Sequence, residues 1–227
     1  MNYFSIVLHH LRKDLRLEWR SKDAINGMLF FSLLVVVVFS MAFDPTASAS
    51  RQIAGGILWV AILFAATTTL NQSWARELRN QVLDAQRMAP SPPSALFLGK
   101  AFANMLFVLA VEVVLAPIFT VFYNLRALGP GWLLLLIMPL GTWALVVNGT
   151  FFAALGLRTR NRELLLPLVL FPISLPALLA MVQATSGVLT NELDPIQLYL
   201  WVKGLAGYDI IFTTVCLLLF ETILHAE

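Results

Sequence analysis

Three carboxylic acids stand within the apolar segments of this chain, where an ionisable group could carry protons or ions. Glu112 lies midway along one apolar stretch, Asp209 lies one turn into the last, and Glu221 lies near the other end of that last stretch. A carboxyl group in hydrocarbon is costly and often functional. A hydrogen-bonded acid between helices explains Glu112 equally well, and a position at the membrane interface explains Glu221. No lysine or arginine stands three or four residues from these acids, so the spacing does not indicate a proton relay.

Other chemistries lack their sequence signatures. The chain contains no G-x-x-x-x-G-K-[ST] loop for nucleotide phosphates, no H-E-x-x-H, no paired C-x-x-C and no G-x-S-x-G. The histidines, at positions 9, 10 and 225, lie near the chain ends, and the single cysteine, Cys216, lies in an apolar run. The sequence therefore predicts a protein that is not an enzyme, with no catalytic residues, no metal site and no directly bound cofactor.

The composition is that of a membrane protein. Of the 227 residues, 59% are hydrophobic and 12% are charged, and the mean hydropathy is +0.81. Soluble domains carry roughly twice that charged fraction. A chain of this kind would expose too much apolar surface in water, so we predict one integral membrane domain.

Six apolar stretches are long enough to cross a hydrocarbon core of about 30 Å. They cover residues 25–43, 53–70, 95–124, 132–157, 164–182 and 204–224. With six spans, both chain ends lie on one side, which then holds twelve of the 15 basic residues; the other side holds Arg51, Arg126 and Lys203. The positive-inside rule makes the richer side cytosolic.

Residues 1–24 show the pattern of an amphipathic helix that lies in the membrane interface. Its apolar stripe consists of Phe4, Leu8, Leu11, Leu15 and Trp19, and basic residues fall off that stripe. A cleavable signal peptide is disfavoured because the following apolar run is too long. The leader also carries the acids Asp14, Glu18 and Asp23. We therefore predict an interfacial helix over 1–24, followed by a six-span domain over 25–227.

The polar stretch after the second span begins with a second amphipathic pattern. Apolar residues repeat there at three- and four-residue steps, at Trp74, Leu78, Val82, Ala85 and Ala89. Prolines at positions 90, 92 and 93 then end the helix. A plain interfacial helix explains this pattern, and so does a short cytosolic helix against which another protein pushes.

Prolines interrupt two predicted spans. The third span would be about 45 Å long if fully helical, and it contains Pro117, which predicts a kink. The fifth contains Pro167, Pro172 and Pro176. We expect no regular helix at that density of proline, because the freed carbonyl groups need donors from neighbouring helices or water.

Four stretches together resemble one known family. They are GGILWVA at 55–61, MAPSP at 88–92 with Gly99-Lys100, LPL at 166–168 with Phe171-Pro172 and Leu175-Pro176, and YDIIF at 208–212 with Leu219-Phe220-Glu221. Taken in order they cover nearly the whole chain, and they resemble CcmB, the B subunit of the haem exporter of cytochrome c maturation. The chain departs from the usual pattern of that family at Arg79-Asn80.

The resemblance implies the permease subunit of an ABC transporter complex in the bacterial inner membrane, with both termini cytosolic. The implied fold is an all-α polytopic membrane protein with six transmembrane helices, an N-terminal amphipathic interfacial helix and a cytosolic coupling helix within 71–94. A separate CcmA-like subunit would hydrolyse ATP, and the implied membrane partners are CcmC-like and CcmD-like. Haem is implied as the transported or handled ligand, with release of a haem-loaded chaperone. The residues implied at the ATPase contact are Trp74, Glu77, Leu78, Val82, Leu83, Asp84 and Met88.

Two other functions fit part of the pattern. The permease of another ABC exporter, for drugs, lipids or polysaccharide, would share the surface helix, the spans and the coupling helix. A proton-coupled secondary transporter built around Glu112 and Asp209 would need no ATPase. The second is disfavoured, because the proline-rich fifth span has no counterpart in the second span and no inverted repeat is evident.

Overall fold

The computed structural model describes residues 2–43, 48–79, 82, 88, 91–125, 128–156 and 162–225, except the side chains of 48–51, 79, 162–165 and 223–225. This described part is helical and contains no strand. Its elements are α1 (Tyr3–Ser21), α2 (Asp23–Ala42), α3 (Ser48–Arg79), α5 (Pro93–Phe122), the 3-10 helix η1 (Gly131–Leu133), α6 (Leu134–Leu155), α7 (Arg162–Thr190) and α8 (Pro195–His225).

Six helices of the described part are long and apolar enough to cross a membrane: α2, α3, α5, α6 together with η1, α7 and α8. Helices suit that environment because each satisfies its backbone hydrogen bonds internally. The predicted fold class, all-α with six membrane-spanning helices, is confirmed.

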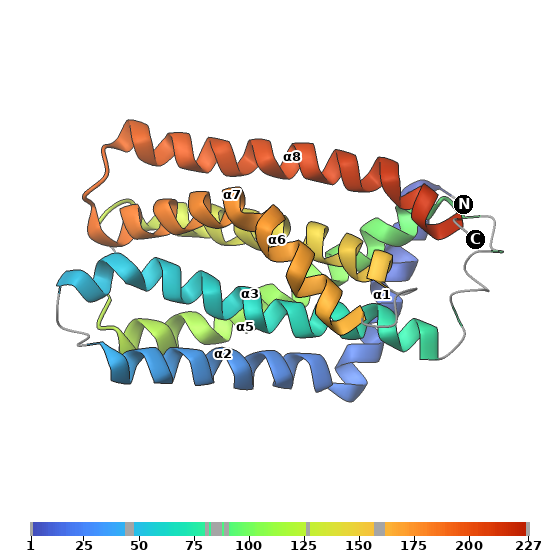
Figure 1. Cartoon of the computed structure of the whole chain (residues 1–227), viewed down its shortest axis with the longest axis horizontal. Coiled ribbons are helices and arrows are strands. Elements are labelled where there is room, and N and C mark those ends of the chain that lie inside the picture. The colour runs from blue at the N-terminus through green and yellow to red at the C-terminus, as the bar shows by residue number, and fades with distance from the viewer. Residues whose placement is uncertain are drawn as a thin grey trace.

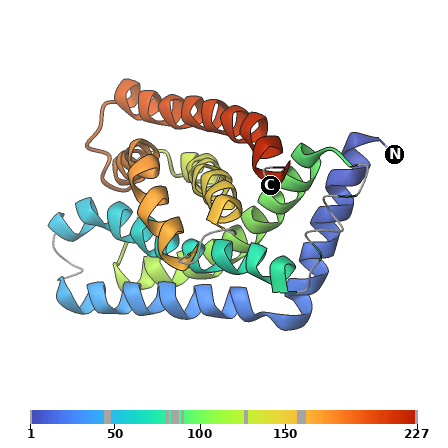
Figure 2. The same cartoon turned by 45° about the vertical axis from the view of Figure 1, so that its right-hand side comes forward.

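The long helices run alongside one another as a bundle, and α1 lies across one end of it (Figures 1 and 2). Both chain ends lie at that same end (Figure 1). There α1 packs against the beginning of α5, and the last turns of α3 lie beside both. We call this end, with α1, residues 70–79 and residues 93–104, the terminal end of the bundle.

Close helix contacts at small residues hold the bundle together. A Cβ atom at Gly141 of α6 would lie 2.3 Å from the indole ring of Trp59 in α3. The same indole donates a hydrogen bond from Nε1 to Thr185 Oγ1 of α7, at 2.9 Å. Close approach at glycine combined with an interhelical hydrogen bond is typical of membrane helix packing.

Helices α3, α7 and α8 are longer than the apolar stretches that predicted them. The second predicted span, 53–70, continues as α3 through Arg79, so its polar end is not a separate element. The predicted loop 183–203 is mostly helical, because α7 continues to Thr190 and α8 begins at Pro195. Hydropathy detects only the apolar length of a helix, whereas backbone hydrogen bonding continues into its polar ends.

The proline-rich segment is also more regular than expected. Helix α7 runs without a break past Pro167, Pro172 and Pro176, although its axis changes direction part-way along its length (Figure 1). Tyr208 of α8 donates a hydrogen bond to the carbonyl oxygen of Ile173, at 2.9 Å, one residue after Pro172. Pro176 leaves the carbonyl of Pro172 without its helical N–H partner, so this bond from α8 supports the segment next to that gap. Helix α5 likewise continues past Pro117.

Candidate functional site

Six charged side chains gather at the terminal end of the bundle, and we call them the charge cluster. They are Lys13, Asp14 and Glu18 of α1, Arg76 and Glu77 of α3, and Lys100 of α5. Every member has a partner of opposite charge within 3.4 Å. Three are cationic and three are anionic, so their formal charges cancel.

Glu18 holds the corner between α1 and α2. Its buried Oε1 atom accepts hydrogen bonds from the backbone N–H groups of Ala24 (2.8 Å) and Ile25 (3.1 Å) in the first turn of α2. Those N–H groups have no partner within the helix, so the carboxylate acts as a cap. The backbone carbonyl of Glu18 also accepts from the N–H of Lys22, a residue with a left-handed φ of 56°. One residue therefore stabilises the end of α1 and the start of α2.

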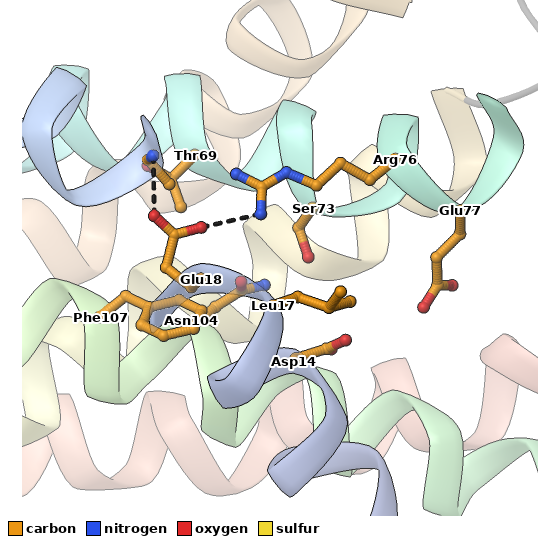
Figure 3. Close-up of a pocket in the computed structure, with 10 residues that line it drawn as sticks. Asp14, Leu17, Glu18, Thr69, Ser73, Arg76, Glu77, Asn104 and Phe107 are labelled. Atoms are coloured by element: carbon orange, nitrogen blue, oxygen red, sulfur yellow. Dashed lines mark hydrogen bonds and ion pairs between the residues drawn. The ribbon is translucent and has the colours of Figure 1, made fainter. Parts of the chain in front are cut away.

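The second oxygen of Glu18 connects this corner to α3. Arg76 Nη1 donates to Glu18 Oε2 at 2.8 Å, and Figure 3 shows the guanidinium group extending along α3 towards the carboxylate. Charge-assisted hydrogen bonds of this kind are about twice as strong as neutral ones. Displacement of α3 at Arg76 would therefore act directly on the corner between α1 and α2.

Glu77, the next residue of α3, joins the other two helices. Its Oε1 atom accepts a hydrogen bond from Lys13 of α1 at 2.5 Å and lies 3.1 Å from Lys100 Nζ of α5. The buried Lys100 ammonium group also contacts Asp14 Oδ2 at 3.2 Å and the carbonyl oxygen of Ser73 at 3.3 Å. An unpaired ammonium group would be costly in this setting, so these contacts hold α1, α3 and α5 together.

Trp74 extends the connections of α3 to two further helices. Its Nε1 atom donates to the carbonyl oxygen of Thr150 in α6 at 2.9 Å. Its ring centroid lies 5.8 Å from that of Phe220 in α8 and 4.7 Å from Lys100 Nζ, a geometry that favours a cation–π interaction. The structure therefore buries Trp74 in the core, whereas the family resemblance implied a contact with the ATPase at this residue.

A small cavity lies beside the charge cluster. Its volume is about 30 Å³, and it is lined by Glu18, Arg76 and Glu77 together with Thr69 and Asn104 (Figure 3). This space suits a water molecule, and it is far smaller than a small-molecule site of roughly 300–1,000 Å³. The charge cluster is therefore suited to joining helices and not to binding an organic ligand.

Two side chains of α1 have perturbed ionisation. Burial alone would lower the pKa of Lys13, but the carboxylates of Asp14 and Glu77 outweigh it and raise the pKa above its usual value. Burial, and next the charge of Lys13, lower the pKa of His10. Near neutral pH, Lys13 is therefore charged and His10 is neutral.

Beyond the charge cluster, the predicted contact segment exposes apolar side chains. Leu78 is exposed at the end of α3, and Val82 and Met88 are exposed helical residues further along. Glu77, by contrast, is buried within the charge cluster. Leu83 and Asp84 lie outside the described residues. The predicted coupling residues thus divide into an inward-facing pair, Trp74 and Glu77, and an outward-facing set of Leu78, Val82 and Met88.

The amino-acid sequence of this chain matches a known family. A family model described as CcmB protein matches residues 5–222. The chain belongs to the CcmB family. The resemblance inferred from the sequence is thereby confirmed.

Relatives within the CcmB family match most of the chain. Heme exporter protein B of Rhodobacter capsulatus is 36% identical over 169 residues, which are 74% of this chain and 77% of that protein. The protein of the same name from Paracoccus denitrificans is 31% identical over 169 residues, with the same two coverages. That of Pseudomonas aeruginosa is 29% identical over 178 residues, or 78% of each chain.

The predicted intramembrane acids of this CcmB-family chain lie apart from the charge cluster. Glu112 of α5 is buried and accepts a hydrogen bond from Thr142 of α6. Asp209 of α8 is buried, and neither of its oxygens has a partner among the described residues. Glu221 is exposed near the end of α8. No hydrogen bond or ion pair within the described part connects these acids, and that part contains no group of three or more His, Cys, Asp or Glu placed to hold a metal ion.

The charge cluster was not predicted from the sequence, because the sequence does not show which residues the acids of α1 meet. In the sequence, Asp14 and Glu18 counted only as evidence against a signal peptide, and Lys100 counted among the basic residues and in the family motif at Gly99-Lys100. A usable signal was present, since Val7, Leu11, Asp14 and Glu18 share one helix face at steps of three and four residues. Two acids on a face with buried apolar residues indicate a partner with cations, but the sequence does not show where that partner lies.

Proposed function

We propose that this chain is the permease subunit of an ABC-type complex that exports or handles haem during cytochrome c maturation. The main support for this proposal is the CcmB-family match over residues 5–222, together with 36% identity to a protein named Heme exporter protein B. Six helices able to cross a membrane support it. The match favours this role over that of a drug, lipid or polysaccharide exporter.

Energy would come from a separate CcmA-like ATPase subunit. The sequence supports this because it contains no phosphate-binding loop of its own. We place the ATPase contact on the exposed apolar residues Leu78, Val82 and Met88, with Leu83 and Asp84 in the same segment. An exposed helical surface of this kind suits insertion into a groove on a partner.

The charge cluster would carry motion from this contact into the spans. Arg76 and Glu77 lie within one helical turn of Leu78, so displacement of the segment moves them with it. Arg76 would pull on Glu18 and hence on the start of α2, while Glu77 would pull on Lys13 and Lys100. One movement at the end of α3 would therefore reach α1, α2 and α5 together.

Haem in this account is the substrate of the complex, and this chain transmits force. The histidine of the described spans is His225, the last residue of α8, beyond the apolar part that ends at Thr222, and their cysteine, Cys216, is buried. CcmC-like and CcmD-like membrane subunits would complete the complex. The split of twelve basic residues against three supports a bacterial inner membrane orientation with both termini cytosolic.

Affinity purification and complementation test this proposal. A tagged chain purified in mild detergent should bring down an ATPase subunit, and it should restore holocytochrome c in cells that lack their own CcmB-family protein. Nucleotide binding by the purified chain alone would contradict the proposal. Failure to restore holocytochrome c despite a normal membrane level would contradict it as well.

A further inference from the structure

A second cavity lies in the half of the bundle farther from the terminal end. Its volume is about 490 Å³, and its walls come mainly from the second half of α5 and the first turns of α6. That volume lies within the range of small-molecule sites. Val113 and Leu135 line the cavity and are 74% and 80% exposed. In a membrane these side chains face lipid, so an apolar molecule could enter sideways from the bilayer.

Glu112 lines this apolar cavity, and one of its carboxyl oxygens has no partner among the described residues. The residue is only 3% exposed. Its Oε1 atom accepts the hydrogen bond from Thr142, and its Oε2 atom has no partner among the described residues. No described residue that lines the cavity carries a positive charge. A carboxylate without a counter-ion is costly among apolar side chains, whereas a neutral carboxyl group can donate a hydrogen bond from Oε2.

Thr185 provides a second donor in the same wall. Its buried Oγ1 atom already accepts the hydrogen bond from Trp59 Nε1, and its own hydroxyl proton has no acceptor within the described part of the chain. Thr120, the other hydroxyl in the wall, donates to the carbonyl of Ala116. Two unused donors in an apolar cavity match a ligand with a hydrogen-bond acceptor.

We infer that this cavity binds a membrane-dissolved amphiphile whose apolar body lies against α5 and α6 and whose carbonyl oxygen accepts hydrogen bonds from Glu112 and Thr185. The carbonyl belongs to a lipid ester or to a quinone ring, because both are carried on apolar bodies in membranes. The inference is independent of the ATPase contact and of haem.

Photolabelling of the purified full-length chain in phosphatidylcholine nanodiscs tests the inference and separates the two sources. One arm uses a phosphatidylcholine with a diazirine on one acyl chain, and the other uses a short-chain azidoquinone. The measured quantity is label on the buried residues Glu112 and Thr185, since lipid around the protein also reaches exposed residues such as Val113. Label from the first probe identifies a phospholipid, and label from the second identifies a quinone.

Matched variants show whether the label reports the cavity. Ala116→Trp would put an indole into the space, whereas Ala110→Trp puts one on an exposed position of α5 outside it. We expect Ala116→Trp to reduce label at Thr185 at least about tenfold, which is the loss expected when a ligand forfeits about 1.4 kcal/mol of binding free energy. Ala110→Trp should leave that label unchanged. Glu112→Gln keeps a donor and should retain the label at Thr185, while Glu112→Leu should lose it.

Two results would overturn the inference. The first is an absence of label at both buried residues with both probes. The second is label at Thr185 that is insensitive to Ala116→Trp and to Glu112→Leu. If Ala116→Trp fails to give a monodisperse protein, the label at Thr185 is compared between Glu112→Leu and Glu112→Gln. Equal label in these two variants would then overturn the inference.

Discussion

Glu18 and Arg76 should be energetically coupled, because the Glu18 side chain is buried and that of Arg76 is mostly buried. The Glu18 side chain is 2% exposed and that of Arg76 is 24% exposed, with 2.8 Å between their charged atoms. Removal of one partner from a buried ion pair costs about 3–5 kcal/mol. Glu18→Ala should fall in that range, because it leaves Arg76 unpaired and also removes the cap on Ala24 and Ile25.

Arg76→Ala should cost less, about 1.5–3 kcal/mol, the value of a hydrogen bond to a charged group. Glu18 would still accept its two backbone hydrogen bonds in that variant. Glu18→Ala combined with Arg76→Ala should then cost less than the sum of the two single changes, by about 1.5–3 kcal/mol.

The assay is reversible unfolding of the purified chain by SDS in mixed micelles, with free energies of unfolding for the wild type, both single variants and the double variant. Arg16→Ala is the control, because Arg16 is exposed on α1 and makes no ion pair within the described part of the chain; it should change stability by less than about 0.5 kcal/mol. Additive effects of the two single variants, within about 0.5 kcal/mol, would refute the idea that this pair joins α3 to the corner of α1 and α2.

Three further predictions follow from α1 and from the orientation of the bundle. Because burial and then Lys13 lower the pKa of His10, the unfolded chain binds more protons than the folded chain just below about pH 6.5. The free energy of unfolding should therefore fall as the pH falls through that region. The variant His10→Gln should show a shallower fall. Gly99→Ala should cost about 1–3 kcal/mol because its Cβ would lie 2.6 Å from that of His10, whereas Gly204→Ala, with no atom within 4 Å, should be tolerated. In a background without the native cysteine, a cysteine at Ser94 should be shielded from an impermeant thiol reagent in intact cells and one at Thr190 should react; the reverse pattern would invert the proposed orientation.

Hydropathy and periodicity predicted the membrane class and the six spanning helices, because lipid imposes a minimum apolar length that is visible in one dimension. They underestimated the polar ends, as at Arg76 and Glu77, because those residues lack the apolar signal although the backbone continues as a helix. The expectation that prolines would break the fifth span was wrong for a related reason. Proline removes a donor locally, but Tyr208, a residue distant in sequence, donates to the carbonyl of Ile173 nearby.

The candidate site was harder to predict, because its members come from three helices. Glu77 and Lys100 are 23 residues apart in sequence, and Lys13 is 64 residues from Glu77; only the packing of α1 across the bundle brings them together. The sequence placed Trp74 and Leu78 on one apolar stripe. A stripe does not show which of its members meets the protein core, and the structure buries Trp74 and exposes Leu78.

The central claim, that the exposed end of α3 receives motion from an ATPase subunit, is tested most directly by Leu78→Asp combined with Val82→Asp. Both side chains are exposed, so the double variant should reach the membrane at the normal level. Two carboxylates without partners in a buried protein contact should weaken that contact by several kcal/mol. Recovery of the ATPase subunit in a pull-down and the level of holocytochrome c should therefore both fall. Normal membrane level with normal ATPase recovery and normal holocytochrome c would contradict the claim, and reduced membrane seating with the ATPase still bound would indicate a plain interfacial helix instead.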